Sequence, residues 1–339
     1  MQQPAEYILP LRWTDRGPLD ELARYLARLV RWVDVTVVDG SPDASFRRHA
    51  RAFPPAVRHV RPAQQQVSRG GNGKVQGVLT GIALARHERL VIADDDVRYT
   101  EEGLSRVLRL LDGADLVRPQ NYFAPLTWHA RWDTGRTLLN RAFASDYPGT
   151  LALRRSTVLA AGGYSTEALF ENLELIRTIR AAGGREVRAD DLFVRRLPCT
   201  TRHFLRQRVR QAYDSFGQPP RLLAELGVLP ALVLIRPDGL RLAGLACGVA
   251  ALAELGRRRR GGRAVYPPAA ALWVPLWLAE RAVCSWLAVL SRARGGVRYS
   301  GGRMRLAAHS ERQLRRRVAA IRPRDGSRGP APVGISARR

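Results

Sequence analysis

The chain has 339 residues and 45% of them are hydrophobic, so it can bury a sizeable core. This composition excludes an intrinsically disordered protein. The formal net charge of +26 rests almost wholly on arginine, because Lys74 is the only lysine among 56 basic residues. Such a charge favours partners that carry phosphate, which are nucleic acids, anionic membranes and phosphorylated substrates.

From residue 7 to about residue 194, short apolar runs alternate with amphipathic stretches. Strands that alternate with helices of this length predict an α/β domain with a mostly parallel sheet covered on both faces. The predicted strands are 7–11, 35–38 and 90–93, and the predicted helices lie near 19–33, 75–86 and 102–111. The domain is predicted to span residues 1–220.

Residues 221–306 are predicted to form a membrane-associated helical region. Three stretches here are rich in Ala, Leu, Val and Trp, namely 222–235, 240–256 and 265–290. None is a clean run of about 20 apolar residues, because charged residues interrupt or flank each one. Arginine clusters follow the second and third stretches, and the positive-inside tendency places both in the cytoplasm. A hairpin of short helices, re-entrant or in the interface, fits better than two independent spans, and a buried helical subdomain is the alternative.

The two ends of the chain carry weaker signals. Residues 307–339 are rich in Arg, Pro, Gly and Ser and are predicted to form a disordered basic tail that contacts anionic lipid. The first 15 residues lack the basic start and apolar run of a signal peptide, so we expect the first domain to stay in the cytoplasm. The three cysteines form no CxxC pair, which fits a reducing compartment and indicates neither a zinc site nor a disulfide framework.

The most informative segment is an apolar strand that runs into Asp94, Asp95 and Asp96. The carboxyl edge of a parallel sheet is where α/β folds open their crevice, so these carboxylates are expected to face it. Asp94 and Asp96 point the same way in an extended chain, which suits Mg²⁺ or Mn²⁺ bridging a diphosphate. An acidic turn that caps the helix starting near Glu101 is the alternative.

Two further loops precede predicted helices. Asp39 ends a buried strand, where its carboxylate can accept a hydrogen bond from a nucleobase or ribose, although an ordinary turn would use the same residue. Lys74 lies in the segment Asn72-Gly-Lys-Val-Gln-Gly77 and is suited to a phosphate or ribose, although a solvated loop would also explain it.

Taken in order, these segments resemble glycosyltransferase family 2, which has the GT-A nucleotide-sugar-binding fold. The resemblance covers about residues 7–213, and its elements are Ile-Leu-Pro-Leu-Arg at 8–12, Thr36–Asp43, the Asn72 segment with Gly81, Asp94–Asp96, Gly149–Arg155 with Gly162–Tyr164, Phe170–Leu175 and Gln207–Gln211.

The resemblance implies inverting transfer of a sugar from a UDP- or GDP-sugar donor. It places Mg²⁺ or Mn²⁺ on Asp96 with Asp94, as a Lewis acid for the departing diphosphate, and a carboxylate base opposite. The donor would contact Pro10, Arg12, Asp39, Lys74, Asp94, Asp95 and Gln207. Gln207 and Arg210 stand where the family has its Gln-x-x-Arg-Trp element, and Arg210 is expected at the catalytic end of the cleft.

The chain departs from the family at three positions. A single Asp39 replaces a pair of aspartates, and Gln211 replaces the tryptophan of Gln-x-x-Arg-Trp. Asn172 stands where the family has its catalytic base, and an asparagine has no proton affinity at neutral pH. Glu171 and Glu174 are the remaining carboxylates, three residues apart on one helix. We expect Glu171 to be the base with Glu174 in reserve, and the alternative is that both are ordinary acids at a helix start.

The C-terminal part has a second, looser resemblance. The segments Trp273–Trp277, Trp286 and Gly296–Arg305 are similar to the end of membrane-bound ceramide or hopanoid-type glucosyltransferases, and Tyr299-Ser-Gly-Gly-Arg303 is a degenerate form of a Trp-Arg-Gly-Arg stretch. This resemblance implies a lipid or glycan acceptor and a position on the cytoplasmic side of the cell membrane.

Two other classes of function compete with this interpretation. A nucleic-acid-binding protein would interleave basic residues with exposed aromatic residues or carry a recognisable binding motif, whereas the arginines here are spread along the chain. We therefore expect no nucleic-acid partner. A catalytically inactive nucleotide-sugar-binding or scaffold protein of the same fold is the second alternative, because of Asn172.

Overall fold

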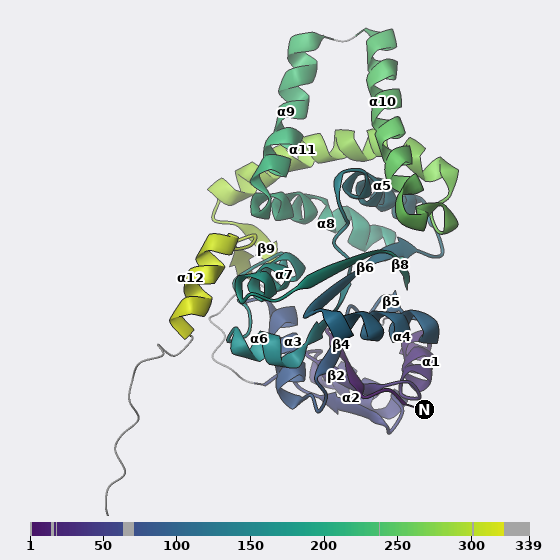
Figure 1. Ribbon diagram of the computed structural model, residues 1–339. Coiled ribbons are helices and arrows are strands. Elements are labelled where there is room, and N and C mark those ends of the chain that lie inside the picture. The colour runs from purple at the N-terminus through teal and green to yellow at the C-terminus, as the bar shows by residue number, and fades with distance from the viewer. Residues whose placement is uncertain are drawn as a thin grey trace, which may run out of the picture.

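The computed structural model describes residues 2–14, 17, 19–63, 71–236, 238–299 and 302–321, and it has a sheet-containing body from which a pair of helices projects (Figure 1). The strands of the main sheet are β1 Ala5–Leu11, β2 Asp34–Asp39, β3 Val57–Val60, β4 Arg89–Ala93, β5 Val97–Arg98, β6 Leu116–Phe123, β7 Thr150–Arg154 and β8 Glu186–Arg196. The helices of the same part of the chain are α1 Leu19–Leu29, α2 Asp43–Ala52, α3 Gly73–Leu84, α4 Glu101–Leu110, α5 Trp128–Phe143, α6 Arg155–Ala160, α7 Glu171–Ala181 and α8 Thr201–Tyr213.

The C-terminal part is mainly helical. It contains α9 Pro219–Ile235, α10 Gly239–Arg258, α11 Val274–Ala293, the small hairpin of β9 Val297–Tyr299 and β10 Gly302–Met304, and α12 Glu311–Ile321. Short 3₁₀ turns at Leu111–Gly113, Asp214–Gly217, Arg259–Ala264 and Pro268–Trp273 connect helices and strands.

In the described part of the chain the main sheet has eight strands in the order β3-β2-β1-β4-β7-β6-β8-β5. Four strand pairings are parallel, and the pairings of β4 with β7, β7 with β6 and β8 with β5 are antiparallel. The predicted α/β architecture, a mostly parallel sheet flanked by helices and followed by apolar helices, is confirmed. The six strands and helices predicted up to residue 111 are also present, with shifts of up to four residues at their ends.

Side chains that alternate along the strands fill two separate cores, one on each face of the sheet. Tyr7 and Leu9 of β1 pack with the buried leucines of α1 and α4. Ile8 of the same strand faces the opposite way and packs with α3, α6 and α7. This period of two explains why the central strands read as continuous apolar runs, because both faces of the sheet are covered.

Helix α3 lies close to β1, and two glycines permit this approach. A Cβ at Gly81 would overlap Ile8, and a Cβ at Gly77 would lie 3.2 Å from Pro10 Cβ. Asn72 caps the helix by accepting a hydrogen bond from Lys74 N. The close packing therefore holds the first turn of α3 beside the end of β1.

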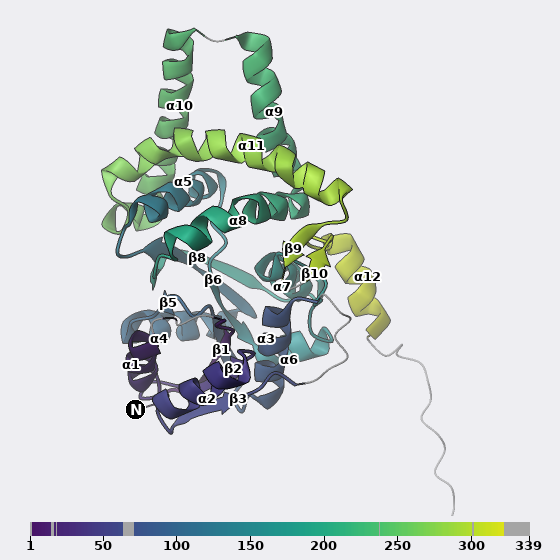
Figure 2. The ribbon, with the colours of Figure 1, turned by 180° about the vertical axis from the view of Figure 1, so that it is seen from behind.

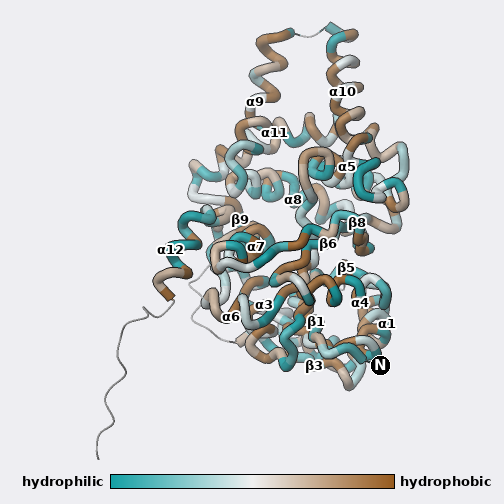
Figure 3. The backbone as a smooth tube through the Cα atoms, viewed as in Figure 1, coloured by the Kyte–Doolittle hydropathy of each residue, from teal (hydrophilic) through white to brown (hydrophobic). Residues whose placement is uncertain are grey.

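Helices α9 and α10 project from the body as two separate rods, and α11 lies across their base (Figures 1 and 2). Apolar residues occupy much of both rods (Figure 3), and the exposed large side chains include Leu223, Val233, Leu234, Ile235, Leu240, Leu242 and Leu245. In the described residues, Gly239–Ala264 and Pro268–Ala293 are long and apolar enough to cross a membrane. In the apolar 18-residue window of each segment, 11% of the residues are buried in the first and 39% in the second, which contains α11 packed on α5, α8 and α9.

The chain after residue 306 does not match its sequence-based prediction throughout. Leu169 N and Phe170 N donate to Leu306 O and Ala307 O, and α12 then packs on α7. The prediction of a disordered tail is therefore wrong for residues 307–321. The physical reason is that Leu314 and Val318, four residues apart, give this arginine-rich segment one buried apolar face. Residues 322–339 lie outside the described residues.

Candidate functional site

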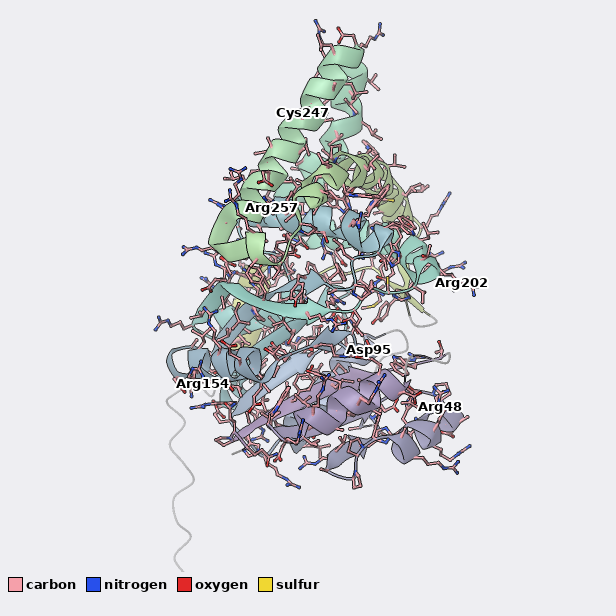
Figure 4. All side chains as sticks on the ribbon, turned by 90° about the vertical axis from the view of Figure 1, so that its right-hand side faces the viewer. Arg48, Asp95, Arg154, Arg202, Cys247 and Arg257 are labelled. Carbon is pink, nitrogen blue, oxygen red and sulfur yellow. The ribbon has the colours of Figure 1, made fainter. Side chains whose placement is uncertain are left out.

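A cavity of about 450 Å³ opens at the carboxyl edge of β1, β2 and β4. These strands are parallel and adjacent, so their ends bring side chains from distant parts of the sequence together. Asp95, which lines the cavity, lies in the middle of the body, well below the projecting helices (Figure 4). Nine residues that the sequence analysis selected line the cavity, namely Pro10, Arg12, Lys74, Asp94, Asp95, Asp96, Glu171, Gln207 and Arg210.

Oppositely charged side chains alternate across the floor of the cavity. Lys74 Nζ lies between a carboxylate oxygen of Asp94 and Glu171 Oε1, at 2.6 Å from the latter. The guanidinium of Arg196 bridges the two outer aspartates, with Nη2 at 3.1 Å from Asp94 Oδ2 and Nε at 2.7 Å from Asp96 Oδ2. The helix starts of α3 and α7 are thus linked through Lys74, and β4 is linked to β8 through Arg196.

The three aspartates differ in how readily they are ionised. Burial raises the pKa of Asp96 to about 6, Arg196 opposes this rise, and the negative charges of Asp94 and Asp95 add to it. Burial also acts against ionisation of Asp94, but Lys74 and Arg196 outweigh it and hold the pKa of Asp94 below its usual value. Burial raises the pKa of Asp95, although this carboxylate accepts a hydrogen bond from Trp13 Nε1.

Gly149 makes room for this cluster at the end of β4. Its carbonyl accepts a hydrogen bond from Asp94 N (2.9 Å), and its own N donates to Asn121 Oδ1 on β6 (2.7 Å). A Cβ at this position would lie 2.7 Å from Asp94 Oδ2 and 3.1 Å from Arg196 Cζ. Any larger residue would therefore displace the Asp94–Arg196 pair.

The oxygens of Asp94 and Asp96 are of the kind that Mg²⁺ and Mn²⁺ prefer. One observation favours such an ion, since Asp96 Oδ1 is buried and has no hydrogen-bond partner among the described residues. Over that same part of the chain, no group of three or more His, Cys, Asp or Glu side chains is arranged to hold a metal ion. The pair of aspartates therefore fits a cation that takes its remaining ligands from a bound molecule or water.

The C-terminal hairpin contributes the far wall of the cavity. Tyr299 Oη donates to Asn72 Oδ1 (3.0 Å), and the guanidinium carbon of Arg210 lies 4.9 Å from the centre of the Tyr299 ring. Tyr299 begins the Tyr299–Arg303 segment of the second resemblance, of which residues 300 and 301 lie outside the described residues. The wall of the cavity thus joins β9, α8 and the cap of α3.

Two residues selected from the sequence do not line the cavity. Asp39 is fully buried behind it, and both its oxygens are engaged, by Ser41 N (2.8 Å), His49 Nδ1 (2.7 Å) and His59 Nε2 (3.0 Å). Glu174 is also fully buried and accepts from His309 N (2.8 Å), with His309 Nδ1 2.7 Å from its other oxygen. Its neighbour on the same helix, Glu171, does face the cavity.

The sequence does not indicate Arg196 and His203 as residues of the cavity, and it indicates Tyr299 only as part of the second resemblance. Arginine is so frequent in this chain that Arg196 carried no signal of its own. Its strand, β8, reaches β4 only through β6 and β7, so the pairing of Arg196 with Asp94 and Asp96 depends on the order of strands in the sheet. Asn172, which stands where the family has a base, donates to Pro148 O (3.0 Å) instead of lining the cavity.

Similar solved structures include a mannosyltransferase, PcManGT, from Pyrobaculum calidifontis in complex with GDP-Man and Mn²⁺, with a TM-score of 0.47, 16% identity and coverage of 95% of this chain and 85% of that one. Glucosyl-3-phosphoglycerate synthase from Mycobacterium tuberculosis in complex with Mn²⁺, UDP-Glc and phosphoglyceric acid has a TM-score of 0.40 and 19% identity, over 60% of this chain and 76% of that one.

A third similar structure is mannosyl-3-phosphoglycerate synthase from Rubrobacter xylanophilus, with a TM-score of 0.41 and 15% identity over 60% of this chain and 69% of that one. No protein-family model and no curated protein matches the sequence. All three TM-scores are below 0.5 and all three identities below 25%, so the assignment of a function rests on this chain's own residues.

Proposed function

We propose that the protein is an inverting, metal-dependent glycosyltransferase of family 2 with the GT-A fold. The observation that carries the proposal is the convergence of Lys74, Asp94, Asp96 and Glu171 on one cavity at the carboxyl edge of the sheet. These residues come from three separate motifs of the family resemblance, at the starts of α3 and α7 and the end of β4. Acidic and basic groups of this kind, held around a space large enough for a ligand, suit a nucleotide diphosphate and its sugar.

The donor in this proposal is a UDP- or GDP-sugar. Asp94 and Asp96 would hold Mg²⁺ or Mn²⁺, which supplies Lewis-acid stabilisation of the leaving diphosphate. Lys74 and Arg12 line the same cavity and can neutralise phosphate oxygens. Pro10, Asp95 and Gln207 complete the proposed donor contacts. Asp39 does not line the cavity itself, but its neighbours Val38 and Gly40 at the end of β2 do. Asp39 would therefore support the donor site from behind the residues that contact the donor.

Glu171 is the proposed catalytic base. An acceptor oxygen would form a bond to the anomeric carbon while the bond from that carbon to the diphosphate oxygen breaks, and the nucleoside diphosphate leaves with the electron pair. The proton of the acceptor hydroxyl passes to the carboxylate of Glu171. Arg210 lines the same cavity, where it can stabilise negative charge as it develops. Glu174, the reserve candidate, is poorly placed to accept this proton, because both of its carboxylate oxygens contact His309.

We further propose that residues 1–220 form the catalytic domain and residues 221–306 attach it to the cytoplasmic face of the cell membrane. The exposed leucines and valines of α9, α10 and α11 support this, because such a large exposed apolar surface marks an interaction site. The tip of the helical hairpin formed by α9 and α10 carries Arg236, Asp238 and Arg241. Each charge at a bilayer centre costs about 2.5–3.5 kcal/mol, which favours a hairpin in the interface.

A thermal-shift panel of UDP- and GDP-sugars with and without Mn²⁺ tests the proposal, followed by assay of donor hydrolysis. We expect one nucleotide sugar to stabilise the wild-type protein in a metal-dependent way and to be hydrolysed slowly. Metal-dependent binding with no hydrolysis and no transfer would support the inactive nucleotide-sugar-binding protein instead. No stabilisation by any of these compounds would contradict both functions.

A further inference from the structure

Within the described residues, three smaller or shallower cavities continue from the candidate site towards the base of the projecting α9–α10 pair. The first, of about 100 Å³, shares Asp96, Arg196, His203 and Gln207 with the candidate site. The second, of about 50 Å³, shares Arg136 and Gln211 with the first. The third, of about 440 Å³, shares Asn140, Tyr147, Gln218 and Arg221 with the second. The cavities therefore form a series from the acidic cluster to the foot of α9.

The last cavity of the series is mainly apolar. It lies between α5, α9 and α11, and its apolar lining includes Leu139, Phe143, Tyr147, Val228, Trp277 and Leu278. Phe143 is 75% exposed at its rim, and Ala224 is exposed on α9. The exposed leucines and valines of the projecting rods begin directly beyond it. An apolar molecule could therefore pass from a membrane surface into this cavity without crossing a polar wall.

The narrow cavity of about 50 Å³ between these two ends, here called the polar passage, is lined by charged groups of both signs. Arg136 and Arg221 line it together with Asp146 and Asp214. Arg221 donates to Glu225 (2.9 Å) and to Asn140 (3.2 Å), whereas Arg136 lies 3.8 Å from Asp146 and its buried Nε has no hydrogen-bond partner in the described residues. Asp146 and Glu225 balance the charges of Arg136 and Arg221 whether or not Asp214 is ionised, so the passage offers donors and acceptors without a net positive charge. This suits hydroxyl groups better than a phosphate.

One carboxylate in this passage is poised to contact a hydroxyl. Asp214 Oδ1 is shielded from solvent and has no hydrogen-bond partner in the described part of the chain. Burial raises the pKa of Asp214 to about 7, with Arg210 opposing this rise and Glu171 adding to it. Phe170, the residue before Glu171, lines the same passage. The passage thus ends beside the proposed base.

We propose that the acceptor is a membrane lipid with an uncharged, hydroxyl-bearing head group, which seats its acyl chains in the apolar cavity and its head group in the polar passage. This inference rests on the proposed glycosyltransferase function and names its acceptor class. The head-group oxygen is glycosylated, its proton passes to Glu171, and the nucleoside diphosphate is the leaving group. Balanced charge along the passage disfavours an anionic lipid phosphate as the acceptor.

Photo-crosslinking tests where the lipid binds. The full chain is mixed with phosphatidylcholine vesicles that contain a diacylglycerol with a diazirine in its acyl chain. We expect crosslinks within 139–147, 224–228 and 277–278. Ala224→Trp should fill the exposed mouth of the cavity and remove these crosslinks. Leu223→Trp is the matched control, because Leu223 is 70% exposed and does not line the cavity, and it should keep them. Crosslinks confined to the rods at 233–245 would overturn the proposal.

Transfer assays test whether that lipid is the acceptor. Vesicles carry diacylglycerol, a glycosyl diacylglycerol or a polyprenyl phosphate, and free glycerol is the water-soluble comparison. We expect transfer to one of the uncharged lipids, about 10-fold or more slower in Ala224→Trp, with stabilisation by Mn²⁺ and the nucleotide sugar unchanged. Preferred transfer to polyprenyl phosphate or glycerol, or equal rates in both tryptophan variants, would overturn the acceptor proposal alone. Loss of nucleotide-sugar stabilisation in the wild-type protein would instead contradict the glycosyltransferase function.

Discussion

Lys74 Nζ lies 2.6 Å from Glu171 Oε1, although the two residues are 97 positions apart in the sequence. The same ammonium group contacts Asp94. Burial alone would lower the pKa of Lys74, but Asp94 and Glu171 outweigh it and raise this pKa. Lys74 is therefore charged, and it ties the proposed base to the proposed metal-binding aspartates. Binding of a diphosphate gives Lys74 a competing anionic partner, which would free Glu171 to accept a proton.

Glu171→Gln should lower turnover by about 10²–10⁴-fold, which is the usual contribution of a general base. The amide keeps the size of the side chain, so stabilisation by donor and metal should persist. Single-turnover assays with a saturating donor measure the change. The proposed role of Glu171 is wrong if turnover stays near that of the wild-type protein.

Glu174→Gln is the matched control on the same helix. Its carboxylate is buried and bound to His309, so the substitution should lower stability by about 1–3 kcal/mol. Turnover of the folded protein should change little. Urea unfolding and the same single-turnover assay separate these two effects, and a large loss of turnover with unchanged stability would move the role of base to Glu174.

Asp96→Ala should remove the synergy between Mn²⁺ and UDP or GDP in thermal stabilisation. The reason is that a diphosphate supplies metal ligands which Asp94 and Asp96 alone lack, so in the wild-type protein the two ligands stabilise more together than separately. Asp112→Ala is a suitable control, because Asp112 is an exposed partner of Arg89 far from the cavity. Metal-dependent stabilisation by the nucleotide that survives in Asp96→Ala would show that the metal binds elsewhere.

Asp39→Asn should destabilise the protein by about 1–3 kcal/mol at neutral pH, because the buried carboxylate accepts from Ser41, His49 and His59. Burial would raise the pKa of Asp39, but these hydrogen bonds outweigh it and lower the pKa below its unfolded value of about 3.9. The contribution of Asp39 is thus present above about pH 4 and lost below it. Urea titrations should show a difference between wild type and Asp39→Asn that shrinks below pH 4.

Asp43→Asn is the control for this effect. Asp43 pairs with Arg61 at the surface, and its side chain is 81% exposed, so its replacement should change stability by less than about 1 kcal/mol. A difference between Asp39→Asn and wild type that does not depend on pH would contradict the assigned pKa direction.

The sequence was sufficient for the parts of the site that follow directly from strand ends. Asp94 and Asp96 end an apolar run, and Lys74 is the only lysine, so both stood out. The sequence does not show that the Asp39 side chain points away from the cavity, because its partners His49 and His59 come from α2 and β3, which are not among the predicted elements. A charged residue next to a strand end indicates that a crevice lies there. Only the packing of the fold decides which carboxylate oxygens already have hydrogen-bond partners within the protein.

The antiparallel part of the sheet shows the same limit. Alternating strands and helices predicted the parallel strands β1, β2 and β4, since each follows a helix or precedes one. The insertion of β7 between β4 and β6 brings Gly149 next to Asp94 and aligns Arg196 with it. No local pattern encodes that strand order, so Arg196 could not be selected. Helix α12 did carry a local signal, the i,i+4 pair Leu314 and Val318, within a basic background.

The last prediction concerns membrane attachment by the projecting helices. Leu234 and Leu240 are 83% and 85% exposed on opposite sides of the hairpin tip, so replacing both with glutamate leaves the packed body unchanged. Burial of a leucine contributes about 1.5–3 kcal/mol, and the loss of two should weaken partitioning by roughly 100-fold or more. Wild-type protein should sediment with membranes and resist extraction by about 1 M salt, because apolar burial is insensitive to screening. The double variant should appear in the soluble fraction, whereas Leu84→Glu, at an exposed position on α3, should sediment like the wild type. Full release of the wild-type protein by salt would reduce the attachment to an electrostatic contact of its arginines.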